Sequence, residues 1–204
     1  MKKRTKSLIF YKTLFIILII AAIVIFSIIF KKQYDDREYD KENDNITTEF
    51  HEAEEKIKDS QEGENNPIQL KMYGYNVIGL IKIPAIDLEY PIIERTTKES
   101  MRLSISRFYG GDINEPGNVS LAGHNNYSGT MFGKNNKLKL GDKVFLTDLT
   151  SRTIEYEIYD IFVTDPNDTS ILETKEKDIR EVTLITCKNG RSERLIIKAR
   201  EILN

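Results

Sequence analysis

Residues 181–200 read EVTLITCKNGRSERLIIKAR. Two runs rich in Val, Leu, Ile and Thr, Glu181–Cys187 and Arg194–Arg200, flank a stretch with the turn-forming pair Asn-Gly. Such runs, separated by turn residues, favour two β-strands joined as a hairpin. If Lys188–Glu193 is the loop, Cys187 and Arg194 face each other at the mouth of the hairpin. Both then stand at the same rim of the sheet.

The cysteine and the arginine at this rim can act together. Thr183, Ile185 and Cys187 share one face of the strand, because strand side chains alternate. An arginine beside a thiol favours the thiolate, which is the nucleophile, and can donate hydrogen bonds to an oxyanion. The alternative for Arg194 is a solvated residue that opens an edge strand. Arg191 is a competing candidate, but it falls inside the loop and is less constrained.

Cys187 is the only cysteine of the 204 residues. A single cysteine outside the cytoplasm is an inert buried thiol, a bridge to another chain or a nucleophile. A nucleophilic cysteine needs a general acid or base within hydrogen-bond reach. His124 is the only histidine available in the expected folded region, where an apolar strand runs into a Gly- and Asn-rich loop, and strand ends that feed loops often carry catalytic groups. The alternative is a surface loop histidine.

The N-terminal region predicts a membrane anchor. Residues 13–30 contain 18 consecutive positions without a charge, close to the ~20 residues that a helix needs to cross a bilayer. Basic residues precede this run and predict that residues 1–12 form a cytoplasmic tail, with the rest of the chain outside the membrane. A cleaved signal peptide is the alternative. The length of the run and the lack of a small-x-small site disfavour it.

Two regions follow the anchor. Residues 31–67 are rich in Asp, Glu, Lys and Asn, which predicts an extracellular charged stalk, with weak helical spacing over Phe50–Ile57. His51 lies in this stalk and is expected to be solvated. Residues 68–204 contain many short β-rich runs between turn signals, with a short helix expected over Glu99–Phe108. This texture predicts one all-β domain, a closed barrel or a sandwich.

Composition excludes several classes of function. The net charge of −2 gives no nucleic-acid footprint, and no Gly-rich phosphate loop is present. One cysteine excludes a disulfide framework and a multi-cysteine zinc site, and two histidines disfavour a His-rich metal centre. We therefore expect no cofactor, no resident metal and no nucleic-acid partner.

From about Tyr75 to the C-terminus, the chain resembles the sortases, the cysteine transpeptidases of Gram-positive surfaces. The segments that carry the resemblance stand in the family's order: IGLIKIP (78–84), LEYPI (88–92), AGHN (122–125), LGDKV (140–144), TLITC (183–187) and RLIIKA (194–199). The resemblance implies a closed β-barrel with His124, Cys187 and Arg194 as the catalytic residues. It also implies that Thr183 lines the substrate groove beside the cysteine.

The resemblance further implies a function and partners. Cys187 would cleave an LPXTG-like sorting signal at the C-terminus of a secreted protein, and an amine of a cell-wall precursor would resolve the thioester. The compact connection between Ile154–Val163 and Glu181–Cys187 favours class D, whereas the residues after His124 resemble class B. The alternatives are a cysteine protease or amidase that uses water, and a stalked surface domain without enzymatic activity.

Overall fold

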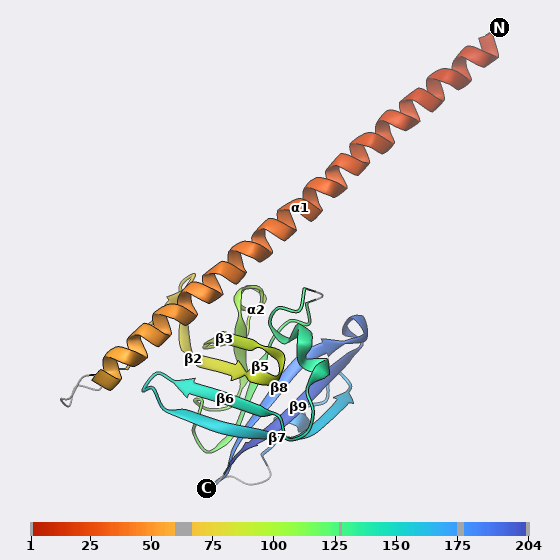
Figure 1. Cartoon of the computed structure of the whole chain (residues 1–204). Helices are drawn as coiled ribbons and strands as arrows, with labels where there is room; N and C mark the ends of the chain where they lie inside the picture. The colour runs from red at the N-terminus through yellow and green to blue at the C-terminus, as the bar shows by residue number, and fades with distance from the viewer. Residues whose placement is uncertain (1, 60–66, 127, 175–177, 203–204) are drawn as a thin grey trace. The chain divides into compact units, whose positions relative to one another are not determined.

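The computed structural model describes residues 2–59, 67–126, 128–174 and 178–202. The chain divides into two compact units, Met1–Tyr39 and Asp40–Asn204. The helix α1 (Lys2–Asp59) contributes residues to both units (Figure 1). Each unit is therefore described by itself.

The first unit carries the apolar part of α1. Among the described residues, this is the one helix that is long and apolar enough to cross a membrane, with a mean hydropathy of 3.2 in its most apolar window. Large apolar side chains from Phe10 to Phe30 are exposed all around it. This part of the helix is therefore apolar on every side, whereas a helix that packs on a soluble core has a single apolar stripe. An apolar surface on every side is expected for a helix surrounded by lipid.

The second unit is built around a β-barrel. Its strands are β1 (Lys71–Met72), β2 (Tyr75–Ile83), β3 (Leu88–Ile93), β4 (Ile105–Tyr109), β5 (Gly117–Ala122), β6 (Lys143–Asp148), β7 (Thr153–Thr164), β8 (Arg180–Lys188) and β9 (Glu193–Glu201). Its short helices are η1 (Pro84–Ile86), α2 (Ser100–Leu103), η2 (Phe132–Lys137), η3 (Ser170–Leu172) and η4 (Asn189–Arg191).

The strands form one sheet in the order β1-β2-β3-β4-β5-β8-β9-β7-β6, and β6 also pairs with β2 (Figure 1). This last pairing closes β2 to β9 into a barrel, so the predicted all-β closed barrel is confirmed. The β3–β4 and β5–β8 pairs are parallel, and the other strand pairs are antiparallel. Because β5 and β8 are parallel, their carboxyl ends meet at the same rim.

The interior of the barrel is apolar. Val182 and Leu184 of β8 and Ile197 of β9 are fully buried in this core. The opposite face of the same strands carries a second, smaller cluster, in which Ile185 and Ile196 pack with Ile171 of η3. Both faces of the β8–β9 pair are therefore covered along their middle, and the two ends of the pair are open to solvent.

The helix expected over Glu99–Phe108 is shorter in the structure. Only α2 is helical, and β4 begins directly after it at Ile105. Ser104 ends the helix in an extended conformation, and its hydroxyl donates to the carbonyl of Pro91 at 2.6 Å. Ile105 then pairs with Ile92 of β3. This parallel pairing between consecutive strands lies outside the expected helix and overrides its local helical preference.

The expected stalk also differs from the structure. Residues 40–59 belong to the barrel unit, and within it Ile46 is 4% exposed and Phe50 is 0% exposed. Asn43 is buried as well, and its side-chain amide donates to the carbonyl of Leu103 at 2.7 Å. The average composition is polar, but the few apolar residues share one helical face and so can be buried together. Residues 60–66 of the expected stalk lie outside the described residues.

Polar contacts hold the same part of α1 against β3. The two ring nitrogens of His51 lie 3.1 Å from a carboxylate oxygen of Glu54 and 3.0 Å from one of Glu89 on β3. Lys82 of β2 also donates to Glu89, at 3.1 Å. The predicted solvated histidine is thus half-exposed, but it bridges the helix and the barrel.

Candidate active site

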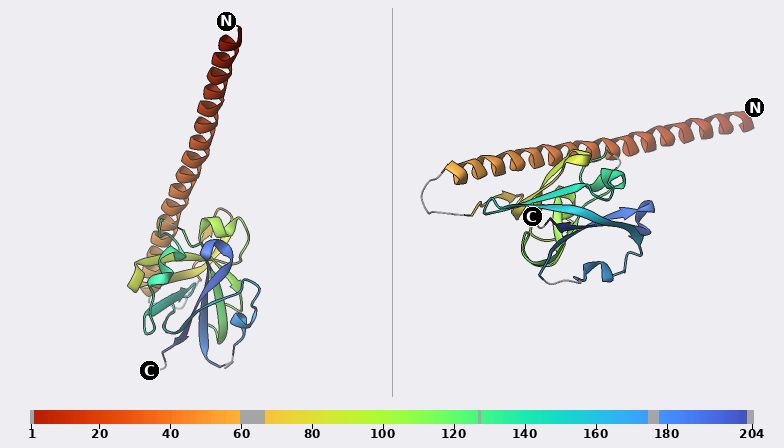
Figure 2. Two further views of the ribbon diagram at one scale, coloured as in Figure 1. Left: turned by 90° about the vertical axis from the view of Figure 1, so that its right-hand side faces the viewer. Right: turned by 60° about the horizontal axis from the view of Figure 1, so that its bottom comes forward.

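The β8–β9 hairpin sets the register of the predicted cysteine and arginine. Cys187 pairs with Arg194 in the antiparallel ladder, as the sequence predicts. The ladder extends one pair further, to Lys188 and Glu193, so the connecting turn is tighter than expected. The hairpin carries this pair at its tip, the blue turn that faces the viewer in the left view of Figure 2.

The turn itself orients the arginine. Asn189, Gly190 and Arg191 all have positive φ, at 49°, 71° and 116°. This left-handed path directs carbonyl groups back toward the hairpin, and Nη1 of Arg194 donates to the carbonyls of Arg191 and Glu193, each at 3.1 Å. Arg191 is exposed in the turn and contributes its backbone to this arrangement. The guanidinium of Arg194 is therefore anchored to its own hairpin.

The parallel pairing of β5 with β8 brings His124 to the same rim. Ala122 pairs with Ile185, and the N–H of Gly123 donates to the carbonyl of Ile185 at 3.2 Å. His124 follows Ala122 by two residues, and Cys187 follows Ile185 by two residues. The continued register therefore sets His124 level with Cys187. The structure brings the three predicted catalytic residues to adjacent strand ends.

All three residues are reachable from solvent. Cys187 is a free thiol, and its side chain is partly exposed, as are those of His124 and Arg194. This exposure argues against the alternative of an inert thiol buried in the core. A nucleophile must contact its substrate, so the rim meets the first requirement for a cysteine active site.

Thr183, the residue expected to line the groove beside Cys187, is buried in the structure. Its side chain is 1% exposed, and its hydroxyl donates to Oδ1 of Asn118 at 2.9 Å. The amide of Asn118 in turn donates to the carbonyls of Ile171 and Leu172 in η3, both at 3.3 Å. Thr183 does lie on the same strand face as Cys187, but residues of η3 cover it.

The segment that covers Thr183 is held by its own hydrogen bonds. Asp168 accepts from the hydroxyl and N–H of Ser170 and from the hydroxyl of Thr164. These hydrogen bonds, the largest from the Ser170 hydroxyl, hold the pKa of Asp168 below its ordinary value. The carboxylate thus fixes the start of η3, which packs Ile171 over Ile185.

Two contacts of this rim were not anticipated from the sequence. The side-chain amide of Asn125 donates to the carbonyl of Cys187 at 2.8 Å. The hydroxyl of Thr186, which is buried, donates to the carbonyl of Gly123 at 2.7 Å. Asn125 directly follows His124, and Thr186 directly precedes Cys187. This adjacency is the only signal in the sequence that could have identified them.

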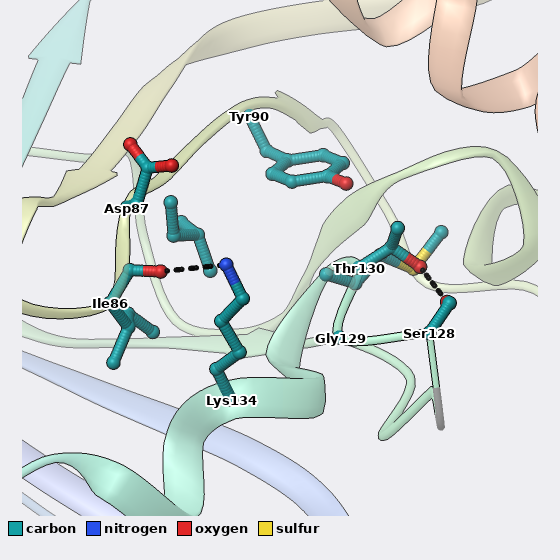
Figure 3. A pocket seen from close by; sticks show the side chains of 9 residues that line it. Ile86, Asp87, Tyr90, Ser128, Gly129, Thr130 and Lys134 are labelled. Carbon is teal, nitrogen blue, oxygen red and sulfur yellow. Dashed lines mark hydrogen bonds between the residues drawn. The ribbon is translucent and has the colours of Figure 1, made fainter.

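A pocket of about 180 Å³ lies elsewhere, between η1, β3 and the loop that follows His124 (Figure 3). Lys134 points across it to the carbonyl of Ile86 at 3.2 Å, and the hydroxyls of Ser128 and Thr130 form another wall, 3.0 Å apart. None of the three predicted catalytic residues lines it. Its volume is below the ~300–1,000 Å³ of ligand sites, so we assign no small molecule to it.

The part of the chain that carries the barrel rim matches a known protein family. A family model described as Sortase domain matches residues 81–202. The chain is similar to Sortase A of Bacillus anthracis, with 34% identity over 112 residues, covering 54% of this chain and 52% of that protein. It is also similar to Sortase D of Bacillus subtilis (strain 168), with 29% identity over 131 residues, covering 64% of each. The chain thus spans about half the length of the Bacillus anthracis relative.

Solved structures of sortases have a fold similar to that of this chain. The structure of a Clostridium perfringens Sortase D5 transpeptidase aligns with a TM-score of 0.60 and 29% identity, covering 80% of this chain and 98% of that chain. The structure of Listeria monocytogenes sortase A aligns with a TM-score of 0.57 and 25% identity, covering 62% of this chain and 88% of that chain. The rim residues His124, Cys187 and Arg194 lie within the residues 81–202 that the family model matches.

Proposed function

Because the chain belongs to the sortase family, we propose that it is a cysteine transpeptidase in which Cys187 is the nucleophile. The observation that carries the proposal is the register of the rim, where Cys187 pairs with Arg194 and His124 comes level with both. Nucleophile, acid–base group and oxyanion donor are the three parts that acyl transfer requires.

In the proposed first half-reaction, His124 takes the proton of the Cys187 thiol, and the resulting thiolate attacks the carbonyl carbon of the scissile peptide bond. The bond to nitrogen breaks, and His124 donates the proton that makes the leaving group a neutral amine. A thioester then joins the substrate to Cys187. General acid–base help of this kind is worth roughly 10²–10⁴-fold in rate.

In the second half-reaction, an incoming amine attacks the thioester carbonyl. His124 takes up a proton from this amine, the thiolate leaves, and a new amide bond forms. An oxyanion develops in both steps, and the guanidinium of Arg194 donates hydrogen bonds to it. The carbonyls of Arg191 and Glu193 support this role, because they accept from Nη1 and so hold the guanidinium near the rim.

We propose that the donor substrate is a secreted protein with an LPXTG-like C-terminal sorting signal and that the acceptor is an amine of a cell-wall precursor. We propose that Thr183 lines the substrate groove beside Cys187, where its hydrogen bond to Asn118 supports the cysteine strand. Class D is favoured over class B by the likeness to Sortase D of Bacillus subtilis and to the Sortase D5 transpeptidase.

We propose the following division of the chain. Residues 1–12 form a cytoplasmic tail, residues 13–30 a single transmembrane anchor, and the remainder lies outside the cell. Residues 68–204 form the catalytic domain. The buried side chains of Ile46 and Phe50 support assigning residues 40–59 to the same folded unit, which leaves 31–39 as the exposed connection.

The proposal is tested with the full chain in detergent and a peptide that carries an LPXTG-type signal. Mass spectrometry follows the products with and without an added amine such as triglycine. A transpeptidase gives a thioester on Cys187 and then a peptide–amine adduct. Hydrolysis alone, unchanged by the amine, would identify a cysteine protease, and no thioester with any peptide of a library would favour the non-enzymatic alternative.

A further inference from the structure

Two side-chain hydrogen bonds continue the β5–β8 pairing beyond the point where the backbone ladder stops. The hydroxyl of Thr186 reaches the carbonyl of Gly123, one residue before His124. The amide of Asn125, one residue after His124, reaches the carbonyl of Cys187 at 2.8 Å. The two bonds therefore flank His124 on both sides and tie it to the strand that carries Cys187.

Asn125 is also fixed from the side of its own loop. It forms an isolated β-bridge with Met131, and the N–H of Phe132 donates to the carbonyl of His124 at 3.0 Å. Met131 is buried and has a φ of 50°, so the loop returns to its starting point along a constrained path. The backbone of Asn125 is thus held by the loop, and its side chain is held by the cysteine strand.

We propose that Asn125 is a positioning residue that keeps the His124 imidazole aligned with the Cys187 thiol. This inference rests on the proposed function, in which Cys187 attacks the carbonyl carbon of the scissile bond while His124 gives a proton to the nitrogen of the same bond. Catalytic groups lose rate steeply when they are misplaced by about 1 Å. His124 lies two residues beyond the last residue of β5, and the bond from Asn125 to the carbonyl of Cys187 ties its carboxyl-terminal side to the cysteine strand.

The next residue along the chain gives a matched control. Asn126 has the same side chain, but its amide donates to the hydroxyl of Thr130 at 2.9 Å, within the loop. Removing that bond leaves the link between the two strand ends intact. Asn125→Ala removes the link, and Asn125→Leu removes it while keeping a side chain of similar shape at an exposed position.

The experiment is a double-mutant cycle on the full chain in detergent. Asn125→Ala, Asn125→Leu and Asn126→Ala are each made alone and together with His124→Ala, and single-turnover acylation by a sorting-signal peptide is measured. Loss of one neutral hydrogen bond predicts a rate about three- to tenfold lower for both Asn125 variants, with unchanged peptide affinity. In the His124→Ala background neither Asn125 variant lowers the rate further, because no imidazole is left to align. Asn126→Ala stays within about twofold.

A second readout does not need turnover of a peptide. Because the chain has one cysteine, its alkylation by iodoacetamide reports on Cys187 alone. We expect His124→Ala to change this rate in the native chain and to change it less when Asn125 is already Ala. Equal effects of Asn125→Ala with and without His124, in either assay, would overturn the positioning role. If no chain forms a thioester, the proposed function fails, and the alkylation cycle still decides whether Asn125 couples to His124.

Discussion

Two arginines near the turn of the β8–β9 hairpin, Arg191 and Arg194, show how much a shift of three residues changes a side chain's role. Arg194 pairs with Cys187, whereas Arg191 is exposed in the turn and offers only its carbonyl to Arg194. Arg194→Ala is expected to lower the rate of acylation by about 10²–10³, the usual cost of losing an oxyanion donor. Arg191→Ala keeps the carbonyl and should leave the rate within a few-fold. Single-turnover acylation of a peptide measures both, and the reverse order of effects would show that the oxyanion donor is Arg191.

A carboxylate far from the rim predicts the response to acid. Burial alone would raise the pKa of Asp148, but hydrogen bonds from Thr150 and Arg152 together outweigh it and hold the pKa below its ordinary value. The unfolded carboxyl binds a proton at about pH 3.9, while the folded one does so only at lower pH. The unfolded state therefore takes up the proton first, and stability that is present above pH 4 is lost as the pH falls through the folded pKa.

Asp148→Asn should flatten this part of the acid response. The variant is expected to be less stable than the native chain at pH 7, because an amide replaces the acceptor of an Arg152 ion pair at 2.9 Å. It should then lose less stability between pH 5 and pH 2. Urea unfolding across this range measures the difference, with Asp165→Asn in an exposed turn as the control. Parallel acid responses in native and variant chains would contradict the assignment.

The rim residues that sequence analysis could identify depend on local rules. Strand alternation and a short turn are enough to set Cys187 opposite Arg194. The burial of Thr183 follows instead from Asn118 and η3, which are distant in sequence and meet it only in the folded barrel. The contact of Asn125 could not be predicted from the sequence for a related reason: its partner is the backbone of a strand 62 residues away.

At the scale of elements, the carboxyl-terminal part of α1 behaves as a piece of the barrel unit. Phe50→Ala is expected to cost about 3–5 kcal/mol of stability, the usual range for a fully buried aromatic side chain, because Phe50 is 0% exposed. Glu49→Ala, on the exposed side of the same turn, should be nearly neutral. Chemical unfolding of the full chain in detergent, followed by circular dichroism, gives both values. Equal and small effects would mean that this helical segment does not stay packed in solution.

Closure of the barrel depends on a residue without a side chain. Gly79 has a φ of 155° at a bulge in β2, where the strand pairs with both β3 and β6. A Cβ there would lie 2.2 Å from the carbonyl oxygen of Thr147 on β6. Gly79→Ala should therefore weaken the β2–β6 seam and lower the melting temperature clearly. Gly111→Ala, which meets nothing within 4 Å, should leave it unchanged, and a matching drop in both would refute the steric argument.

Elements were predictable where their pattern is local. The β-rich runs Ile154–Val163, Glu181–Cys187 and Arg194–Arg200 match β7, β8 and β9 to within one residue at each end. The family resemblance distinguished a closed barrel from a sandwich. The helix predicted over Glu99–Phe108 is too long because Ile105 pairs with Ile92 of β3, a contact that the residues of this segment do not by themselves predict. The docked part of α1 was missed because its apolar positions are few, although they recur on one face.

At the scale of the whole molecule, the exposed apolar helix and the basic residues before it predict one crossing with the N-terminus inside. Protease added to intact protoplasts should digest the barrel unit, while a tag fused before Lys2 stays protected. Exchanging the basic residues between the two ends of residues 13–30 should reduce the correctly oriented fraction. Full protection of the barrel unit in the native chain would reverse the proposed topology.

The parallel arrangement of β5 and β8 also governs when the chain can become reactive. Their carboxyl ends meet only after the chain between them has folded back across the barrel, and such non-local pairing forms late and slowly. A chain in which β5 and β8 have not yet paired therefore carries a cysteine without its neighbours, and the thiol gains them only through this pairing. The reactivity of the Cys187 thiol during refolding should therefore become dependent on His124 at the time when β5 and β8 pair and the barrel closes.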